Sequence, residues 1–326
     1  MIYFLVDCLI KRDLRCMPAG SLGLSLNIMK PLHPIPQCVE CLMSLAKDVA
    51  ALAEPENPGL VEKAERISRE VLAEAAHNES SSPQIANRIL RKIRQITGIA
   101  DPYADFKARE MDQARKIFAQ LQARVGKDLR SRVKMAALGN SLDFFNDPAQ
   151  VLAEIPHQFN QGISFYHDNV DRLEANLAQK PQTVLYLTDN AGEIYFDLPF
   201  YEYLQQYCRK IYLAVKGGPA LNDLTRSELQ AAELAGRFDE VADTGSDGAG
   251  LDWENLSAQF RKLLSSADLV VSKGMANFET LYPKRISAAS FYLFKVKCEP
   301  IQNFIQAPVG SFLAVWKDAA ALKTEN

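Results

Sequence analysis

The chain has 326 residues, of which 48% are hydrophobic and 24% are charged, and this composition is typical of a folded globular protein. Its 37 Lys and Arg against 40 Asp and Glu give a net charge of -3, and the absence of any basic run excludes a nucleic-acid footprint. The apolar start of the chain is interrupted by Asp7 and is too short to cross a membrane, so we expect no membrane partner. The 6 cysteines suit a reducing compartment, and we expect the cytoplasm.

The first half of the sequence has a helical pattern. We expect residues 1–28 to be a non-structural extension, because a Pro-rich segment follows Met29 at once. From about Cys38 to about Gln179 the apolar residues recur mostly at helical spacing, and no alternating run is long enough to propose a strand. The sequence therefore predicts a helical N-terminal subdomain over residues 29–180. Its clearest helical stretches are 38–53, 61–76, 83–97 and 104–125.

The pattern changes at Thr183 to short, apolar, β-rich runs that alternate with helical stretches. Alternation of this kind predicts an α/β fold with a mainly parallel sheet covered on both faces, here over residues 181–326. The expected strands are 183–188, 210–215, 238–242, 268–273, 291–297 and 312–316, and the expected helices lie near 193–207, 226–235 and 254–265. We expect these two parts to form one compact unit, because no Ser/Gly-rich linker separates them.

Polar residues follow the expected strands at their carboxyl ends, where ligands bind in open parallel sheets. Asp189, Asn190 and Asp223 offer hard oxygen donors that suit Mg²⁺ or Mn²⁺. Lys216 and Lys273 are each followed by glycine, and both lysines could direct positive charge at phosphate oxygens.

Each of these residues also has a simpler interpretation. An Asp-Asn pair after a strand is often a turn or a helix N-cap, and a lysine at a strand end is usually solvated. Asp223 is not needed as a cap, because Thr225 and Glu228 already form a capping box. Glu193 could simply favour a helix N-terminus, and Asn277 and Glu279 could cap a turn.

Two further motifs stay open at this point. The glycine-rich loop 244–250 could hold a phosphate or admit a sugar, although a flexible loop is the simpler interpretation. Cys38 and Cys41 have half the spacing of a zinc site, but no second pair follows, so core thiols are the simpler interpretation.

Four phrases of the sequence closely resemble the damage-control phosphatase family, also called the acidic-residue-methyltransferase-1-like domain, and the likeness runs from about Pro36 over nearly the whole chain. The phrases are AALGNSLDF, TDNAGE, VKGGPALND and ADLVVSKGMANFE. The resemblance implies a helical N-terminal layer on a Rossmann-like, three-layer α/β/α core. It also implies a divalent metal, with Mg²⁺, Mn²⁺, Co²⁺ and Ni²⁺ as candidates, held by Asp189, Asn190 and Asp223.

The same resemblance assigns roles to further residues. It implies that Lys273 binds phosphate and that Glu193, Lys216 and Asn277 line the substrate side. Asn140 and Asp143 would approach from the helical layer. Asp189 and Lys273 are expected to be catalytic. Asp189 would act either as the nucleophile or as a ligand of a metal that activates water, and the sequence leaves both routes open.

We therefore expect a metal-dependent phosphatase that hydrolyses phosphomonoesters of small metabolites, such as sugar phosphates, phosphopantetheine-like compounds or damaged phosphometabolites. One alternative is a carboxyl methyltransferase that uses S-adenosylmethionine. Another is a non-catalytic module that binds a metal or a phosphometabolite without turnover. The sequence does not indicate an oligomeric state.

Overall fold

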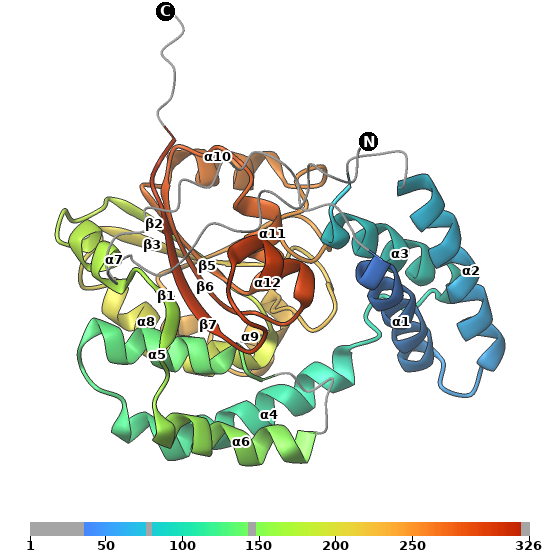
Figure 1. Cartoon of the computed structure of the whole chain (residues 1–326), viewed down its shortest axis with the longest axis horizontal. Coiled ribbons are helices and arrows are strands. Elements are labelled where there is room, and N and C mark those ends of the chain that lie inside the picture. The colour runs from blue at the N-terminus through green and yellow to red at the C-terminus, as the bar shows by residue number, and fades with distance from the viewer. Residues whose placement is uncertain (1–35, 76–79, 143–147, 321–326) are drawn as a thin grey trace, which may run out of the picture.

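The computed structural model describes residues 36–75, 80–142 and 148–320 (Figure 1). The predicted extension 1–28 lies outside these residues. The described chain is an α/β protein built on a seven-stranded, mostly parallel sheet, so the predicted fold class is confirmed. The strands are β1 (Phe165–Asp168), β2 (Thr183–Leu187), β3 (Lys210–Val215), β4 (Glu240–Asp243), β5 (Leu269–Lys273), β6 (Ala289–Lys295) and β7 (Phe312–Lys317).

The sheet has the order β1-β7-β6-β5-β2-β3-β4. From β4 to β6 all neighbouring strands are parallel, β7 runs antiparallel to β6, and β1 runs parallel to β7. The chain passes from β2 outward to β3 and β4, then returns to β5 on the other side of β2. This reversal is the topological switch point of a doubly wound sheet, and ligands of such sheets bind at the carboxyl ends of the strands there, here those of β2 and β5.

Strand β1 was not expected, because it lies inside the range 29–180 for which we predicted only helices. Its four residues, FYHD, are too few to give a period-2 pattern, and only two of them are partly buried. Pairing with β7, which is about 150 residues further along the chain, stabilises this edge strand. Such a strand is defined by its tertiary partner and not by its own sequence.

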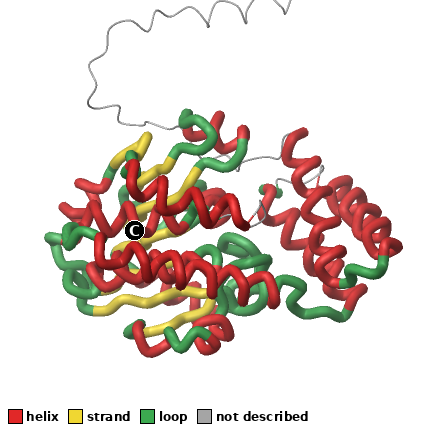
Figure 2. Tube along the Cα trace, turned by 90° about the horizontal axis from the view of Figure 1, so that it is seen from below, coloured by secondary structure: helices red, strands yellow, loops and turns green. Residues whose placement is uncertain are grey.

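Helices cover both faces of the sheet, as Figure 2 shows with the strands lying between them. One face packs against α4 (Ala104–Leu121), α5 (Leu129–Gly139), α6 (Pro148–Gln161), α7 (Val170–Leu177), α8 (Ile194–Leu204) and α9 (Arg226–Ala231). The other face packs against α10 (Ala258–Ser266), α11 (Met275–Leu281) and α12 (Glu299–Ile305). In β2 the side chains alternate between these two cores, because Val184 and Tyr186 join the first and Leu185 and Leu187 join the second.

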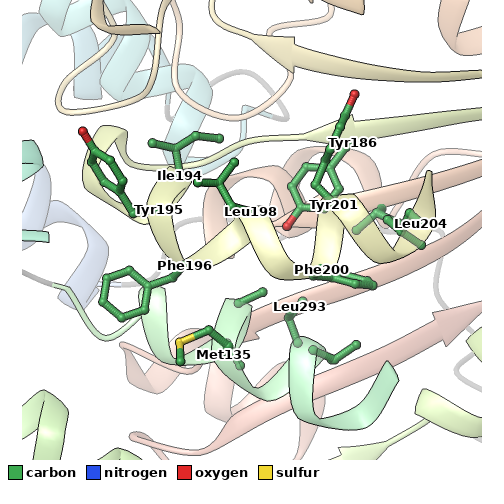
Figure 3. Close-up of a cluster of buried hydrophobic side chains, with 14 of the residues drawn as sticks. Met135, Tyr186, Ile194, Tyr195, Phe196, Leu198, Phe200, Tyr201, Leu204 and Leu293 are labelled. Atoms are coloured by element: carbon green, nitrogen blue, oxygen red, sulfur yellow. The ribbon is translucent and has the colours of Figure 1, made fainter. Parts of the chain in front are cut away.

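The larger core is densest between α5, α8 and the sheet. Figure 3 shows Phe196 and Phe200 of α8 beside Met135 of α5 and Leu293 of β6, and all four side chains are buried. Burial of each such side chain stabilises the fold by about 1.5–3 kcal/mol. This packing fixes α5 and α8 against the sheet at the end where the site forms.

The first three helices form a separate lobe, which we call the helical lobe: α1 (Pro36–Ala53), α2 (Pro58–Ala75) and α3 (Ser82–Thr97) (Figure 1). They have a hydrophobic core of their own, which includes Ala46, Ala64 and Ile89. The predicted helical half therefore consists of this lobe and of α4 to α7, which belong to the layer on the sheet. Among the described helices, none combines the length and hydrophobicity that a membrane span requires.

Candidate active site

The loop after β2 and the loop after β3 meet directly at the switch point. The amide of Leu224 donates to the carbonyl of Asp189 at 3.0 Å, and Asn190 and Asp223 face each other in an isolated antiparallel bridge. The amide of Ala191 also donates to the carbonyl of Asn222 at 2.8 Å. The structure thus brings together Asp189, Asn190 and Asp223, the three expected metal donors.

The end of β5 is shaped to admit the Asp189 carboxylate. Gly274 has φ of +81°, and a β-carbon built there would lie 2.0 Å from Oδ2 of Asp189. No other residue could occupy this position without displacing the carboxylate, so the glycine that follows Lys273 is required by close approach as well as by conformation.

Asn140 reaches the site from the helical layer, as the resemblance implied. It is the C-cap of α5, and its Nδ2 donates to Oδ2 of Asp189 at 3.0 Å and to Oε1 of Glu193 at 2.8 Å. Its Oδ1 accepts from the amide of Lys295 at 2.9 Å. One buried amide therefore connects the two carboxylates to β6. Asp143, the other expected contact, lies outside the described residues.

Lys273 is completely buried and its ammonium is held by two carboxylates. Nζ donates to Oε2 of Glu193 at 2.9 Å and to Oδ1 of Asp197 at 2.6 Å. Burial opposes the charge, but Asp197 and Glu193 outweigh it and hold the pKa of Lys273 above its ordinary value. In this structure Lys273 orders Glu193, and its expected contact with phosphate stays a prediction.

Lys216 is buried beside Asp223. Its Nζ is 3.3 Å from Oδ2 of Asp223, donates to the carbonyl of Gly250 at 2.6 Å and reaches Oδ1 of Asn277 at 3.4 Å. Asn277 in turn donates to the carbonyls of Thr188 and Lys273 at 2.9 and 2.8 Å. Lys216 and Asn277 are therefore ordered at the carboxyl ends of β2, β3 and β5.

Negative charge accumulates around Asp189. Burial raises the pKa of Asp189 well above its ordinary value, and the charges of Glu193 and Asp223 raise it further. Burial also raises the pKa of Asp223, although Lys216 opposes the shift. Carboxylates arranged in this way favour a proton or a cation among them.

Glu110 of α4 is a site residue that the sequence did not reveal. Its Oε1 accepts from the amide of Gly192 and its Oε2 accepts from Nδ2 of Asn222, both at 3.0 Å. Burial raises the pKa of Glu110 to about 8, while the hydrogen bonds from Asn222 and Gly192 oppose the shift. Glu110 thus holds both loops that carry the expected metal donors. It lies in a helix with no motif around it, so no sequence signal could have found it.

Lys297 is a second residue near the site that the sequence did not reveal. It is only partly buried, and its charge lowers the pKa of both Asp189 and Glu110. It falls inside the expected strand 291–297, but β6 ends at Lys295. A third lysine near a strand end could have indicated this residue. It was missed because the apolar run FYLFKVK continues past the true end of the strand, so Lys297 was counted as part of the strand.

Cys38 and Cys41 lie on α1 and are free thiols. Cys38 is only partly buried and Cys41 is exposed, so the interpretation as core thiols is wrong. Within residues 36–75, 80–142 and 148–320, no three His, Cys, Asp or Glu side chains form a group that could hold a metal. The expected donors at the switch point are not a group of that kind, since one of the three is the amide of Asn190.

Buried carboxylates and lysines gather at the switch point of this α/β sheet, which is the place where open α/β sheets bind small ligands. Residues 35–313 match the family model described as the damage-control phosphatase ARMT1-like domain, so the chain belongs to that family. The resemblance noted in the sequence is therefore confirmed, and the protein is a phosphatase.

Individual relatives agree with this assignment. The chain is 30% identical over 287 residues to a damage-control phosphatase of Archaeoglobus fulgidus, and the match covers 86% of this chain and 97% of that protein. It is 26% identical over 283 residues to a damage-control phosphatase of Pyrococcus horikoshii, covering 86% of this chain and 96% of that protein. A crystal structure of a DUF89 family protein from Pyrococcus horikoshii superimposes with a TM-score of 0.77 at 26% identity and covers 86% of this chain and 98% of that one.

Proposed function

We propose that this phosphatase hydrolyses phosphomonoesters of small metabolites, including damaged ones, with a divalent metal held by Asp189, Asn190 and Asp223. The observation that carries the proposal is the backbone bridge between Asn190 and Asp223, which places Asp223 opposite Asn190, the residue next to Asp189 in the chain. Mg²⁺, Mn²⁺, Co²⁺ and Ni²⁺ are the candidate ions, because carboxylate and amide oxygens suit hard or borderline divalent metals.

The donor set fits such an ion. Oδ2 of Asp223 is buried and accepts no hydrogen bond from the residues that the structure describes, although it faces the Lys216 ammonium. The charges of Glu193 and Asp223 disfavour the ionised form of Asp189. A divalent cation would relieve this repulsion and would supply positive charge to phosphoryl oxygens.

The side chains of the chain would bind and orient the substrate. Lys216, next to Asp223, would contact the phosphate, and the partly exposed Lys297, whose charge acts on Asp189, would supply a second positive charge to it. Charge stabilisation by such cations is the main contribution to phosphoryl transfer, since the transferring group carries negative charge throughout. Asn277 would keep Lys216 aimed at the phosphate.

Asn140 orients the Asp189 carboxylate. Its Nδ2 donates to one carboxylate oxygen of Asp189, which fixes the rotamer and leaves the other oxygen directed elsewhere. An oriented carboxylate could attack phosphorus or hold the metal, and both routes require the same hydrogen bond. Glu193 accepts from Asn140, Asn190 and Lys273, so it would position these residues and line the substrate side.

The test is phosphate release from p-nitrophenyl phosphate and a panel of sugar phosphates by the full chain. Activity that is lost with chelator and restored by Mg²⁺, Mn²⁺, Co²⁺ or Ni²⁺ would support the proposal. Release that persists in chelator would overturn its metal dependence. Tight binding of a phosphometabolite without release would favour a binding module, and methyl transfer from S-adenosylmethionine would favour the methyltransferase alternative. A reducing compartment such as the cytoplasm fits the proposal, because the described cysteines are free thiols.

A further inference from the structure

The glycine-rich loop 244–250 lies between the helical lobe and the active site and contacts both. Asn87 of α3 exchanges two hydrogen bonds with Ala249, donating to its carbonyl at 3.2 Å and accepting from its amide at 2.8 Å. A β-carbon at Gly248 would lie 2.5 Å from Nδ2 of Asn87, so the glycine permits this close approach. The loop is therefore held by protein, in contrast to the flexible loop that we considered from the sequence.

Two arginines of α3 bind the same loop. Arg91 donates to Oδ1 of Asp247 at 2.8 Å through Nε and at 2.6 Å through Nη2, and it also pairs with Asp252. Arg94 donates to Oδ2 of Asp247 at 2.6 Å. Asn87, Arg91 and Arg94 are spaced i, i+4 and i+7, so they lie on one face of α3. That face contacts the loop, and Arg94 also donates to the carbonyl of Pro219 in the segment after β3.

The opposite side of the loop touches a site lysine. The carbonyl of Gly250 accepts from Nζ of Lys216 at 2.6 Å, which is the shortest contact that this ammonium makes among its described partners. The amide of Leu251 donates to Oγ1 of Thr280 on α11 at 2.8 Å, and this bond fixes the loop at its far end. Ala249 and Gly250 are adjacent, so a shift at Asn87 reaches Lys216 through one peptide unit.

We propose that the helical lobe orients the Lys216 ammonium through the glycine-rich loop. Asn87, Arg91 and Arg94 are then positioning residues for the reaction. The inference rests on the proposed function, in which Lys216 contacts the phosphate. The ammonium has three donors, and the Gly250 carbonyl fixes the direction of one of them. Displacement of that carbonyl by about 1 Å is enough to misalign a charged contact in a transition state.

The experiment is a double-mutant cycle on the full chain with Arg91→Met and Lys216→Met, read as kcat and KM for p-nitrophenyl phosphate. Arg91→Met removes the guanidinium but keeps an apolar stem, and Asp247 retains Arg94 as a partner. We expect Arg91→Met to lower kcat about 3- to 30-fold in the parent and to have no further effect on kcat in the Lys216→Met background. If Arg91→Met lowers kcat by the same factor in the parent and in the Lys216→Met background, the proposal is wrong. Arg91 would then act through a general structural effect that does not depend on Lys216.

Three additions keep the result decisive. Arg69→Met is the matched control, since this exposed arginine of the helical lobe pairs locally with Glu65, and we expect parent kcat. Asn87→Ala replaces Arg91→Met if that variant melts early, because it removes both bonds to Ala249 without a change in charge. The same double-mutant cycle is also measured on the affinity for inorganic phosphate. This readout tests the coupling of Arg91 to Lys216 even if the parent protein shows no turnover. Absence of turnover in the parent would count against the proposed function and not against the coupling.

Discussion

The Asp189 carboxylate lies directly over the α-carbon of Gly274, at the carboxyl end of the neighbouring strand β5. A β-carbon at Gly274 would come within 2.0 Å of Oδ2 and 2.4 Å of Oδ1 of Asp189. The site therefore depends on the absence of a side chain at this position as much as on the carboxylate.

Gly274→Ala should lower kcat about 100-fold, because the new methyl group displaces Asp189 by about 1 Å or more. The measurement is steady-state hydrolysis of p-nitrophenyl phosphate together with thermal melting. Gly310→Ala is the matched control, since Gly310 has φ of +90° but nothing within 4 Å of the added atom. Equal losses of activity in the two variants would show that backbone strain, and not the contact with Asp189, is responsible.

Asp223→Asn should weaken divalent-metal binding at least about tenfold, because a charged oxygen donor becomes a neutral one. Isothermal titration with Mn²⁺ measures the effect without relying on activity. Asp243→Asn is the control, since Asp243 also ends a strand but pairs with Arg226 and is partly exposed. Unchanged Mn²⁺ affinity in Asp223→Asn would show that the metal ligands are assigned wrongly.

Lys273→Met should lower the free energy of unfolding by about 3–5 kcal/mol, because Glu193 and Asp197 would be left buried without their cation. Denaturant unfolding monitored by circular dichroism measures the loss. Lys210→Met, which removes a half-exposed lysine paired with Glu240, should leave the free energy of unfolding close to that of the parent. If Lys273→Met retains full stability but loses phosphate affinity, Lys273 serves the substrate and not the fold.

Glu279→Gln should change how stability depends on pH. Burial raises the pKa of Glu279 from 4.5 to about 8, so the folded state binds this proton more tightly than the unfolded state does. The stabilisation by the proton is complete below about pH 4.5 and is lost as the pH rises through about 8. The variant should therefore melt above the parent at pH 8.5 and close to it at pH 4.5.

Thermal melting across this pH range tests that expectation. Glu62→Gln, at an exposed position of α2, is the control and should follow the parent curve. Parallel melting curves for Glu279→Gln and the parent would show that Glu279 ionises without penalty in the folded protein.

The alternation of apolar β-rich runs with helical stretches in the sequence predicted six of the seven strands. It also predicted the edge of the sheet where polar residues gather. It could do so because β2, β3 and β5 are mostly buried and apolar and are followed within two residues by Asp189, Lys216 and Gly274. The remaining strand, β1, is too short to have a pattern of its own. The role expected for Asn140 came from the family resemblance. The spacing of apolar residues in α5 did not indicate it.

The tertiary structure alone decided which of the gathered side chains touch. Lys273 and Lys216 look alike in sequence, since each lies at the end of an apolar strand and precedes a glycine. In the fold, Lys273 is buried between two carboxylates and Lys216 faces Asp223 and the glycine-rich loop. Glu110 joins the site from α4, more than 80 residues before Gly192. Local sequence sets backbone hydrogen bonding and the buried face of each element, whereas contacts between distant elements depend on how whole layers pack, and no local pattern encodes them.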